Sequence, residues 1–150
     1  VEGSTFQEGH AMLETGTPRI AEAIGWGAAV EWLDRHDMKE IHSHINTIAS
    51  WTAEQISEID GITVYGDPTR GDSSGAVSFL HESIQSQDLA LLLDEGGFAV
   101  RTGHHCAQPL MDALGVPSTN RASFWLYNTM DEAEAFVEHL RYVVDRFSDK

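Results

Sequence analysis

Residues 99–111 read Ala-Val-Arg-Thr-Gly-His-His-Cys-Ala-Gln-Pro-Leu-Met and contain the single cysteine of the chain, Cys106. A Gly-Gly turn signal precedes the apolar residues at the start of this stretch, so residues 98–101 are predicted to form a short strand. Pro109 is typical of the first turn of a helix, and residues 110–114 are predicted to continue that helix. Cys106 is therefore predicted to lie in a polar loop between a strand and a helix.

The surroundings of Cys106 favour a reactive thiol. A thiol reacts as its thiolate, which nearby cationic groups favour, and Arg101, His104 and His105 are its close neighbours in the sequence. The alternative is a small buried hydrophobic residue, because unpaired cysteine is among the most buried residue types. A metal site is not expected, because adjacent residues rarely point at one ion and the chain has no second cysteine.

Length and composition indicate a globular domain. The chain has 150 residues, of which 41% are hydrophobic, enough to bury a real core. It has no apolar run of about 18 residues and no secretory signal pattern, so no membrane span is expected. The single cysteine excludes an internal disulfide framework. We therefore expect a cytoplasmic protein.

The charge balance is strongly acidic. Asp and Glu number 24 against 9 Lys and Arg, which gives a formal charge of −15, and the only lysines are Lys39 and Lys150. Nucleic acid is not an expected partner, because binding to phosphates needs clustered basic residues. Two explanations are open: a basic partner, or a halophilic protein working in high salt that screens its self-repulsion. The acidic residues are spread along the whole chain, which favours the high-salt explanation.

Hydrophobic periodicity divides the remaining sequence into further elements. The predicted helices cover residues 20–35, 37–58, 87–94 and 131–147, the predicted strands cover residues 62–65, 76–80 and 122–126, and loops cover residues 1–18 and 67–74. This order of elements predicts a small α/β fold, in which helices pack against one short sheet.

Three stretches resemble motifs of one enzyme family. Residues 100–111 resemble the active-site cysteine loop of SufS-type cysteine desulfurases, which are pyridoxal-phosphate enzymes of the class-V aminotransferase family. Residues 121–129 resemble the substrate-binding strand of that family, and residues 14–18 (Glu-x-Gly-Thr-Pro) resemble its phosphate-contacting loop. The motifs occur in the order of the family and span nearly the whole chain.

The resemblance implies a reaction and a role for several residues. In the family, a thiolate takes sulfur from L-cysteine, alanine leaves, and a persulfide stays on the enzyme. Cys106 matches this nucleophile, and Arg121 matches the arginine that binds the substrate carboxylate. Thr17 matches a residue that contacts the cofactor phosphate of the partner subunit, which implies a homodimer.

Most of these residues have a structural alternative. Arg121 could instead form a surface ion pair, and Thr17 could cap the helix that follows it. Arg101 and His104 either hold the loop and tune the thiol or are simply structural. Asn128 matches a substrate-side hydrogen-bond partner, with a role in a turn as its alternative.

The resemblance also implies a domain assignment. Residues 36–150 match the small C-terminal domain of fold-type I pyridoxal-phosphate enzymes, and residues 1–35 match the edge of the larger cofactor domain. Neither Lys39 nor Lys150 has the buried setting that the covalent cofactor link needs. We therefore expect a piece of a longer enzyme that is inactive by itself.

The predicted function is that of a cysteine desulfurase fragment. It would mobilise sulfur for iron–sulfur cluster assembly, with a sulfur-acceptor or scaffold protein as its partner. One alternative is a free-standing persulfide carrier or interaction module that needs no cofactor. A selenocysteine lyase is another, which the sequence does not separate from a desulfurase.

Overall fold

The computed structural model describes residues 3, 5, 7–14, 16–67 and 74–147. The chain divides into two compact units, Val1–Asp37 and Met38–Lys150. In the first unit, the described residues form a 3-10 helix, η1 (Gly9–Met12), and an α-helix, α1 (Ile20–Leu33). The helix predicted over residues 20–35 is thus confirmed, whereas the expectation of a continuous loop over residues 1–18 was wrong at η1.

Helix α1 is apolar around its whole circumference, and none of its residues is buried. Trp26, for example, is 75% exposed. A helix that is apolar all round is typical of helices enclosed by a larger structure. The N-cap of α1 is Arg19, without a side-chain cap. The alternative role of Thr17 as a helix cap is therefore wrong.

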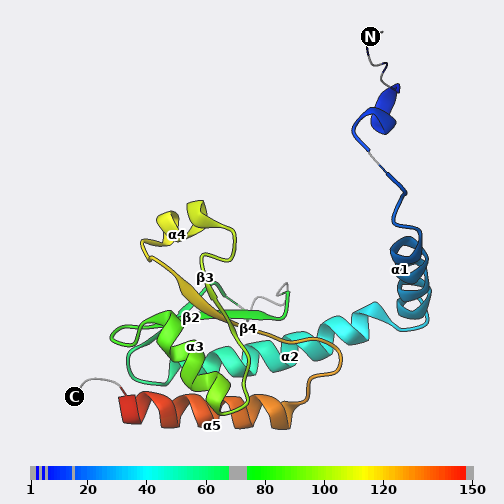
Figure 1. Cartoon of the computed structure of the whole chain (residues 1–150). Coiled ribbons are helices and arrows are strands. Elements are labelled where there is room, and N and C mark those ends of the chain that lie inside the picture. The colour runs from blue at the N-terminus through cyan, green and yellow to red at the C-terminus, as the bar shows by residue number, and fades with distance from the viewer. Residues whose placement is uncertain (1–2, 4, 6, 15, 68–73, 148–150) are drawn as a thin grey trace. The chain divides into compact units, whose positions relative to one another are not determined.

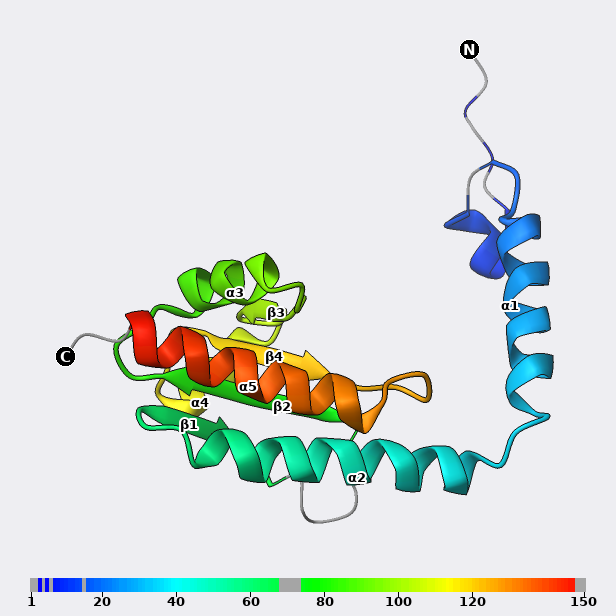
Figure 2. The same cartoon turned by 90° about the horizontal axis from the view of Figure 1, so that it is seen from below.

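The second unit is built on an antiparallel sheet with the strand order β1-β2-β4-β3. Helices α2, α3 and α5 lie on one face of the sheet, and the short helix α4 lies on the other side (Figure 1; Figure 2). This arrangement confirms the predicted α/β fold. The bounds are β1 (Ile62–Tyr65), β2 (Ala76–His81), β3 (Arg101–Gly103), β4 (Thr119–Ser123), α2 (Met38–Ser57), α3 (Ser86–Glu95), α4 (Gln108–Leu114) and α5 (Met130–Phe147).

The core lies between the sheet and helices α2, α3 and α5. In β2, Val77 and Phe79 are buried, whereas Ser78 between them is only half-buried, because successive side chains of a strand point to opposite faces. The predicted apolar stripes of α2 and α5 complete the core. Their buried apolar residues are Ile45, Ile48, Ala49, Ala53, Ile56, Ala133, Phe136, Val137, Leu140, Val143 and Val144.

Two strands differ from their predicted positions. β3 begins only at the last residue of the strand predicted over residues 98–101, and β4 begins before the strand predicted over residues 122–126 and ends inside it. The ladder pairs polar residues, for example Thr102 with Asn120. Phe98 packs against the core without joining the ladder. Both predictions were wrong because they followed apolar residues, whereas cross-strand hydrogen bonds define these strands.

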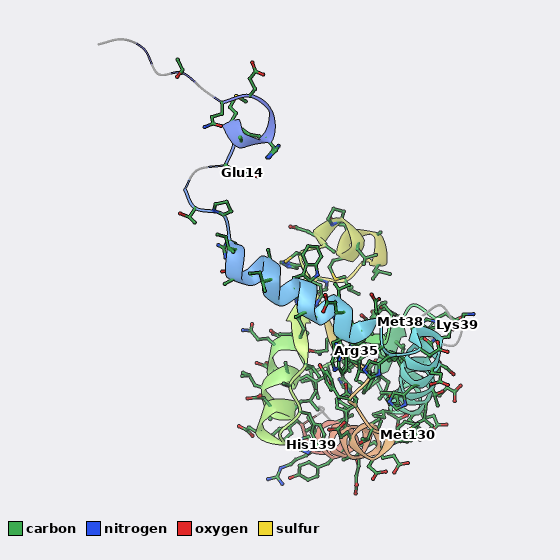
Figure 3. The ribbon with its side chains drawn as sticks, turned by 90° about the vertical axis from the view of Figure 1, so that its right-hand side faces the viewer. Glu14, Arg35, Met38, Lys39, Met130 and His139 are labelled. Atoms are coloured by element: carbon green, nitrogen blue, oxygen red, sulfur yellow. The ribbon has the colours of Figure 1, made fainter. Side chains whose placement is uncertain are left out.

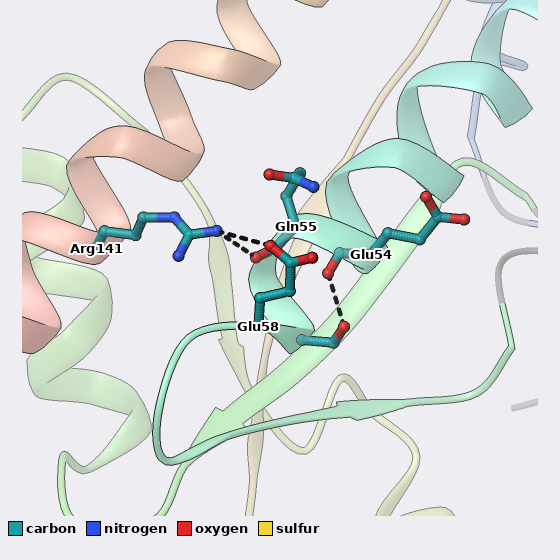
Figure 4. A network of polar contacts seen from close by, with 5 residues as sticks. Glu54, Gln55, Glu58 and Arg141 are labelled. Carbon is teal, nitrogen blue, oxygen red and sulfur yellow. Dashed lines mark hydrogen bonds and ion pairs between the residues drawn. The ribbon is translucent and has the colours of Figure 1, made fainter.

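Charged side chains lie at both ends of α2. Lys39 lies exposed in the first turn of the helix (Figure 3). At the other end, Arg141 of α5 donates from Nη2 to the carbonyl oxygen of Gln55 at 3.0 Å and to Glu58 at 3.4 Å (Figure 4). The last carbonyls of a helix lack partners within the helix, so this cation suits the end of α2.

Within the described residues, no helix combines the length and the apolar character needed to cross a membrane.

Candidate active site

The cysteine loop, residues 104–107, joins β3 to α4 in a tight turn. The backbone N–H of Ala107 donates to the carbonyl oxygen of His104 at 2.9 Å. The two residues between them have positive φ angles, 56° at His105 and 62° at Cys106. Two consecutive positive φ angles are typical of a type I′ turn, which usually contains Gly, Asn or Asp. Other residues in this region are strained, at a cost of about 1–3 kcal/mol each.

The thiol of Cys106 is exposed and contacts a cation. Arg101 donates from Nη2 to Sγ of Cys106 at 3.3 Å, and the exposure of the cysteine contradicts the alternative of a buried hydrophobic residue. A guanidinium N–H stabilises negative charge on a sulfur. His104 begins the turn and is exposed. The structure thus gathers three residues of the predicted site in one short segment.

Four side chains form a row across the sheet, on the face opposite the core. The register pairs Tyr65 with Ser78, Ser78 with Arg121, and Arg121 with Arg101. Register partners of antiparallel strands point to the same face, and both neighbours of Ser78 in β2 point into the core. The row therefore brings Arg121 beside the residue that contacts the thiol.

Arg121 has the environment of an anion-binding residue. Like charges placed opposite each other on neighbouring strands are destabilising, and no carboxylate of the described chain forms an ion pair with Arg101 or Arg121. In addition, Nε of Arg121 is buried and has no hydrogen-bond partner among the described residues. An ion pair as the alternative role of Arg121 is thus wrong within the described part of the chain. A carboxylate or phosphate would supply the missing acceptor.

A cavity of about 400 Å³ lies between α4 and the open face of the sheet. Leu110 and Met111 of α4 form an apolar wall, and Ser78, His105 and Arg121 contribute polar groups. An apolar wall with a few converging polar groups is typical of small-molecule sites. The cavity suits a small ligand that carries an anionic group.

His105 connects the cysteine loop to β4. Its Nε2 lies 3.1 Å from the carbonyl oxygen and 3.0 Å from Oγ1 of Thr119. Because a carbonyl oxygen only accepts, Nε2 carries the proton, and the buried Nδ1 has no partner among the described residues. Burial lowers the pKa of His105 below its ordinary value of 6.5; the hydrogen bond to Thr119 raises it, and the nearby charges of Arg121, Arg101 and His104 lower it further.

Asn128 has its described contacts outside the cysteine loop, and Thr17 belongs to the first unit. Oδ1 of Asn128 accepts from the backbone N–H of Trp125 at 2.8 Å, and Nδ2 donates to Glu132 at 3.3 Å. The side chain thus has the turn role that the sequence offered as an alternative, and no described contact joins it to the cysteine loop. Thr17 is exposed in the first unit. The substrate and cofactor roles of these two residues stay predictions.

The sequence did not single out His105 or Thr119 as site residues. The spacing of residues in a sequence does not show which way a histidine ring points. Thr119 lies outside the strand that periodicity predicted over residues 122–126. No residue pattern marks the positive φ angles at His105 and Cys106 on which the contact with Thr119 depends. No cluster of metal-ligating side chains is found in the described residues.

Comparisons with known proteins agree with this fold. The model of one protein family, Aminotransferase class-V, matches residues 1–136. The chain belongs to the class-V aminotransferase family.

Its relatives within this family include cysteine desulfurases. The chain is 44% identical over 144 residues to a probable cysteine desulfurase of Halalkalibacterium halodurans, covering 96% of this chain and 35% of the relative. It is 40% identical over 137 residues to the cysteine desulfurase of Haloferax volcanii, covering 91% of this chain and 32% of the relative. The crystal structure of the Escherichia coli cysteine desulfurase CsdA matches with a TM-score of 0.84 and 33% identity, over 97% of this chain and 37% of CsdA. The chain thus spans about a third of the length of the curated relatives it matches.

Proposed function

We propose that this chain is part of a cysteine desulfurase and accepts sulfur from L-cysteine on Cys106. The observation that carries the proposal is the 3.3 Å contact between Arg101 Nη2 and Cys106 Sγ on an exposed turn. The names of the relatives at 44% and 40% identity support the activity. The SufS type stays a prediction from the sequence motifs.

Cys106 would act as the nucleophile. Its thiolate attacks the substrate sulfur, a sulfur–sulfur bond forms, and the carbon–sulfur bond of the substrate breaks. The electron pair of that bond stays with the substrate carbon, which takes up a proton and leaves as alanine. Arg101 stabilises the negative charge on Sγ before the attack, and His104 lies at the start of the same turn. Cys106 then carries the sulfur as a persulfide.

Arg121 would hold the carboxylate of the substrate. Its planar guanidinium matches a carboxylate with two parallel hydrogen bonds. The missing partner of its buried Nε and the uncompensated charge of Arg101 opposite support this role. The neighbouring cavity of about 400 Å³ has room for an amino acid.

Pyridoxal phosphate is the cofactor that the family implies, and when bound it withdraws electrons from the substrate. The described residues fit the substrate side of such a site, through Arg121 and Arg101. Lys39 lies exposed in the first turn of α2 and does not fit a covalent link to the cofactor. We place the linking lysine in the part of the relatives that this chain does not span. Thr17 would reach the cofactor phosphate of the partner subunit, which requires a homodimer.

The same proposal covers the domain division, the sulfur acceptor and the compartment. Residues 1–35 would belong to the edge of the cofactor domain and residues 36–150 to the small domain, a division that the two compact units support. The persulfide would pass to a sulfur acceptor or an iron–sulfur scaffold protein. We propose the cytoplasm as the compartment, because thiols are kept reduced there.

A chimera tests the function. This chain replaces the aligned part of the Haloferax volcanii cysteine desulfurase, and alanine release and persulfide on Cys106 are measured with and without Cys106→Ser. We expect the chimera to turn over cysteine and the serine variant to bind cysteine without releasing alanine. Turnover at the parent rate by the serine variant would contradict the role of Cys106. A chimera without activity, together with an isolated chain that accepts sulfur from a small persulfide, would favour the carrier function.

A further inference from the structure

Among the contacts that hold the cysteine loop, three lie around its turn. The Ala107–His104 hydrogen bond closes the turn, Arg101 contacts Sγ, and the ring of His105 reaches Thr119. Thr119 is only 1% exposed and belongs to β4, so it is a fixed part of the sheet. The ring of His105 thus connects the loop to the buried end of β4.

Thr119 contacts the chain both before the turn and inside it. It is the register partner of Gly103, the last residue before the loop, and it also receives the hydrogen bond from His105 inside the loop. One strand residue therefore holds the chain on entry to the turn and again at its centre. Cys106 directly follows His105 in this turn.

We infer that His105 is a positioning residue, whose hydrogen bond to Thr119 keeps the left-handed turn in place and thereby keeps Sγ of Cys106 against Arg101. This inference rests on the proposed function where it concerns turnover. The turn needs such support because it places two non-glycine residues at positive φ angles. On its C-terminal side the loop continues into α4, where the carbonyl oxygen of Ala107 accepts from the backbone N–H groups of Leu110 and Met111.

The chemistry of histidine suits this role. Histidine is enriched among non-glycine residues with positive φ angles, and its Nε2 can donate to an oxygen far from its own backbone. Glutamine offers a neutral N–H donor at a similar reach, whereas alanine offers none. His105→Ala therefore removes the ring and its hydrogen bond together, whereas His105→Gln replaces the ring and keeps a donor.

The test measures the rate at which iodoacetamide alkylates Cys106 in the full 150-residue chain at neutral pH. His105→Ala is expected to slow alkylation about fivefold, since one hydrogen bond that holds the thiolate-stabilising geometry is lost. His105→Gln is expected to restore most of the parent rate. Access to the reagent is not limiting, because Cys106 is exposed in the parent.

His139→Ala is the matched control. His139 lies on α5, and its Nε2 is also within hydrogen-bond distance of a backbone carbonyl oxygen, that of Leu92, at 3.2 Å. We expect this variant to lose stability in a thermal melt and to keep the parent alkylation rate. Thr119→Val removes the hydroxyl and keeps the backbone carbonyl, so its alkylation rate should lie between those of the parent and His105→Ala. This variant replaces His105→Ala in the test if His105→Ala does not fold.

The chimera with the Haloferax volcanii enzyme adds a second measurement. His105→Ala should lower kcat with little change in KM, because Arg121 still binds the carboxylate, and His105→Gln should recover kcat. Parent alkylation rates in both His105→Ala and Thr119→Val would overturn the inference, and so would equal rates in the alanine and glutamine variants. A chimera inactive in every version would instead contradict the proposed function, while the alkylation rates would still decide the role of His105.

Discussion

Arg101 and Arg121 face each other as register partners across β3 and β4. Two cations in this position repel one another, in a chain whose net charge is −15. Acidic side chains are abundant, yet none in the described chain forms an ion pair with either arginine. We therefore propose this pair as an anion site on the open face of the sheet, beside the thiol that would take up sulfur.

Arg121→Ala should weaken the use of cysteine by the chimera. The loss of a two-pronged, charge-assisted contact costs on the order of 2–4 kcal/mol, or roughly 30- to 1000-fold in kcat/KM. Arg121→Lys should recover only part of this loss, because an ammonium group cannot form two parallel hydrogen bonds with a carboxylate. Steady-state kinetics of alanine release would measure both effects.

Arg146→Ala is the control for that experiment. Arg146 lies exposed near the end of α5 and donates to the hydroxyl of Tyr142 at 2.8 Å. We expect kcat/KM of this variant to equal that of the parent. A similar loss in the variants of Arg146 and Arg121 would mean that overall charge, and not the clamp, determines activity.

The start of α5 should make stability depend on pH. Thr129 N–H donates to Glu132 at 2.8 Å, and Glu132 N–H donates to Oγ1 of Thr129 at 3.2 Å, a reciprocal capping box. These bonds, first that of the Thr129 backbone and then that of Asn128, lower the pKa of Glu132 below 4.5. Since the folded state binds the proton less well, the carboxylate stabilises the fold above pH 4.5, and this contribution is lost as the pH falls through the lowered pKa.

Urea unfolding of Glu132→Ala and the parent would measure this effect. We expect the difference in unfolding free energy to be largest at neutral pH and to shrink in acid. Glu134→Ala is the control, because Glu134 lies exposed on the same helix outside the capping box. A difference for Glu132→Ala that stays constant with pH would show that the ionised carboxylate does not stabilise the cap.

Salt should stabilise the chain. The charge of −15 makes the compact state repel itself at low ionic strength, and added ions screen that repulsion. Thermal melts should therefore give a higher midpoint in molar potassium chloride than in dilute buffer. Glu138→Lys, at an exposed position of α5, should reduce the difference between the two conditions. Equal midpoints of the parent in both conditions would contradict a halophilic adaptation.

Lys39 should not bind pyridoxal phosphate covalently. It is exposed in the first turn of α2, without the buried setting that activates a lysine. After incubation of the chain with the cofactor and reduction with borohydride, mass spectrometry should find no pyridoxyl group on Lys39. A stoichiometric adduct there would overturn our placement of the linking lysine outside this chain.

The sequence predicted the helices of the core better than the strands of the site. Helices α2 and α5 repeat apolar residues over several turns, so their positions followed from periodicity. β3 and β4 pair through Arg101, Thr102, Asn120 and Arg121, which carry no apolar alternation. Only the hydrogen-bond ladder identifies these strands, and a ladder joins residues that are distant in the sequence.

The same limit applies to the candidate site. Arg101, His104 and Cys106 lie within a few residues of one another, so sequence proximity alone suggested one cluster. Arg121 was assigned through a family resemblance, and its place beside Arg101 depends on the sheet register. The ring contact of His105 depends on left-handed backbone angles that no residue pattern reveals.

The alternation of β2 has a consequence for how this sequence can diverge. Val77 and Phe79 build the core, while Ser78 belongs to the row that includes Arg121. Because the two sets interleave residue by residue, one inserted or deleted residue within β2 would exchange them and turn Ser78 inward. A point substitution in β2 can change either the core or the row of side chains that includes Arg121, without changing the other. A change in the length of the strand would disrupt both.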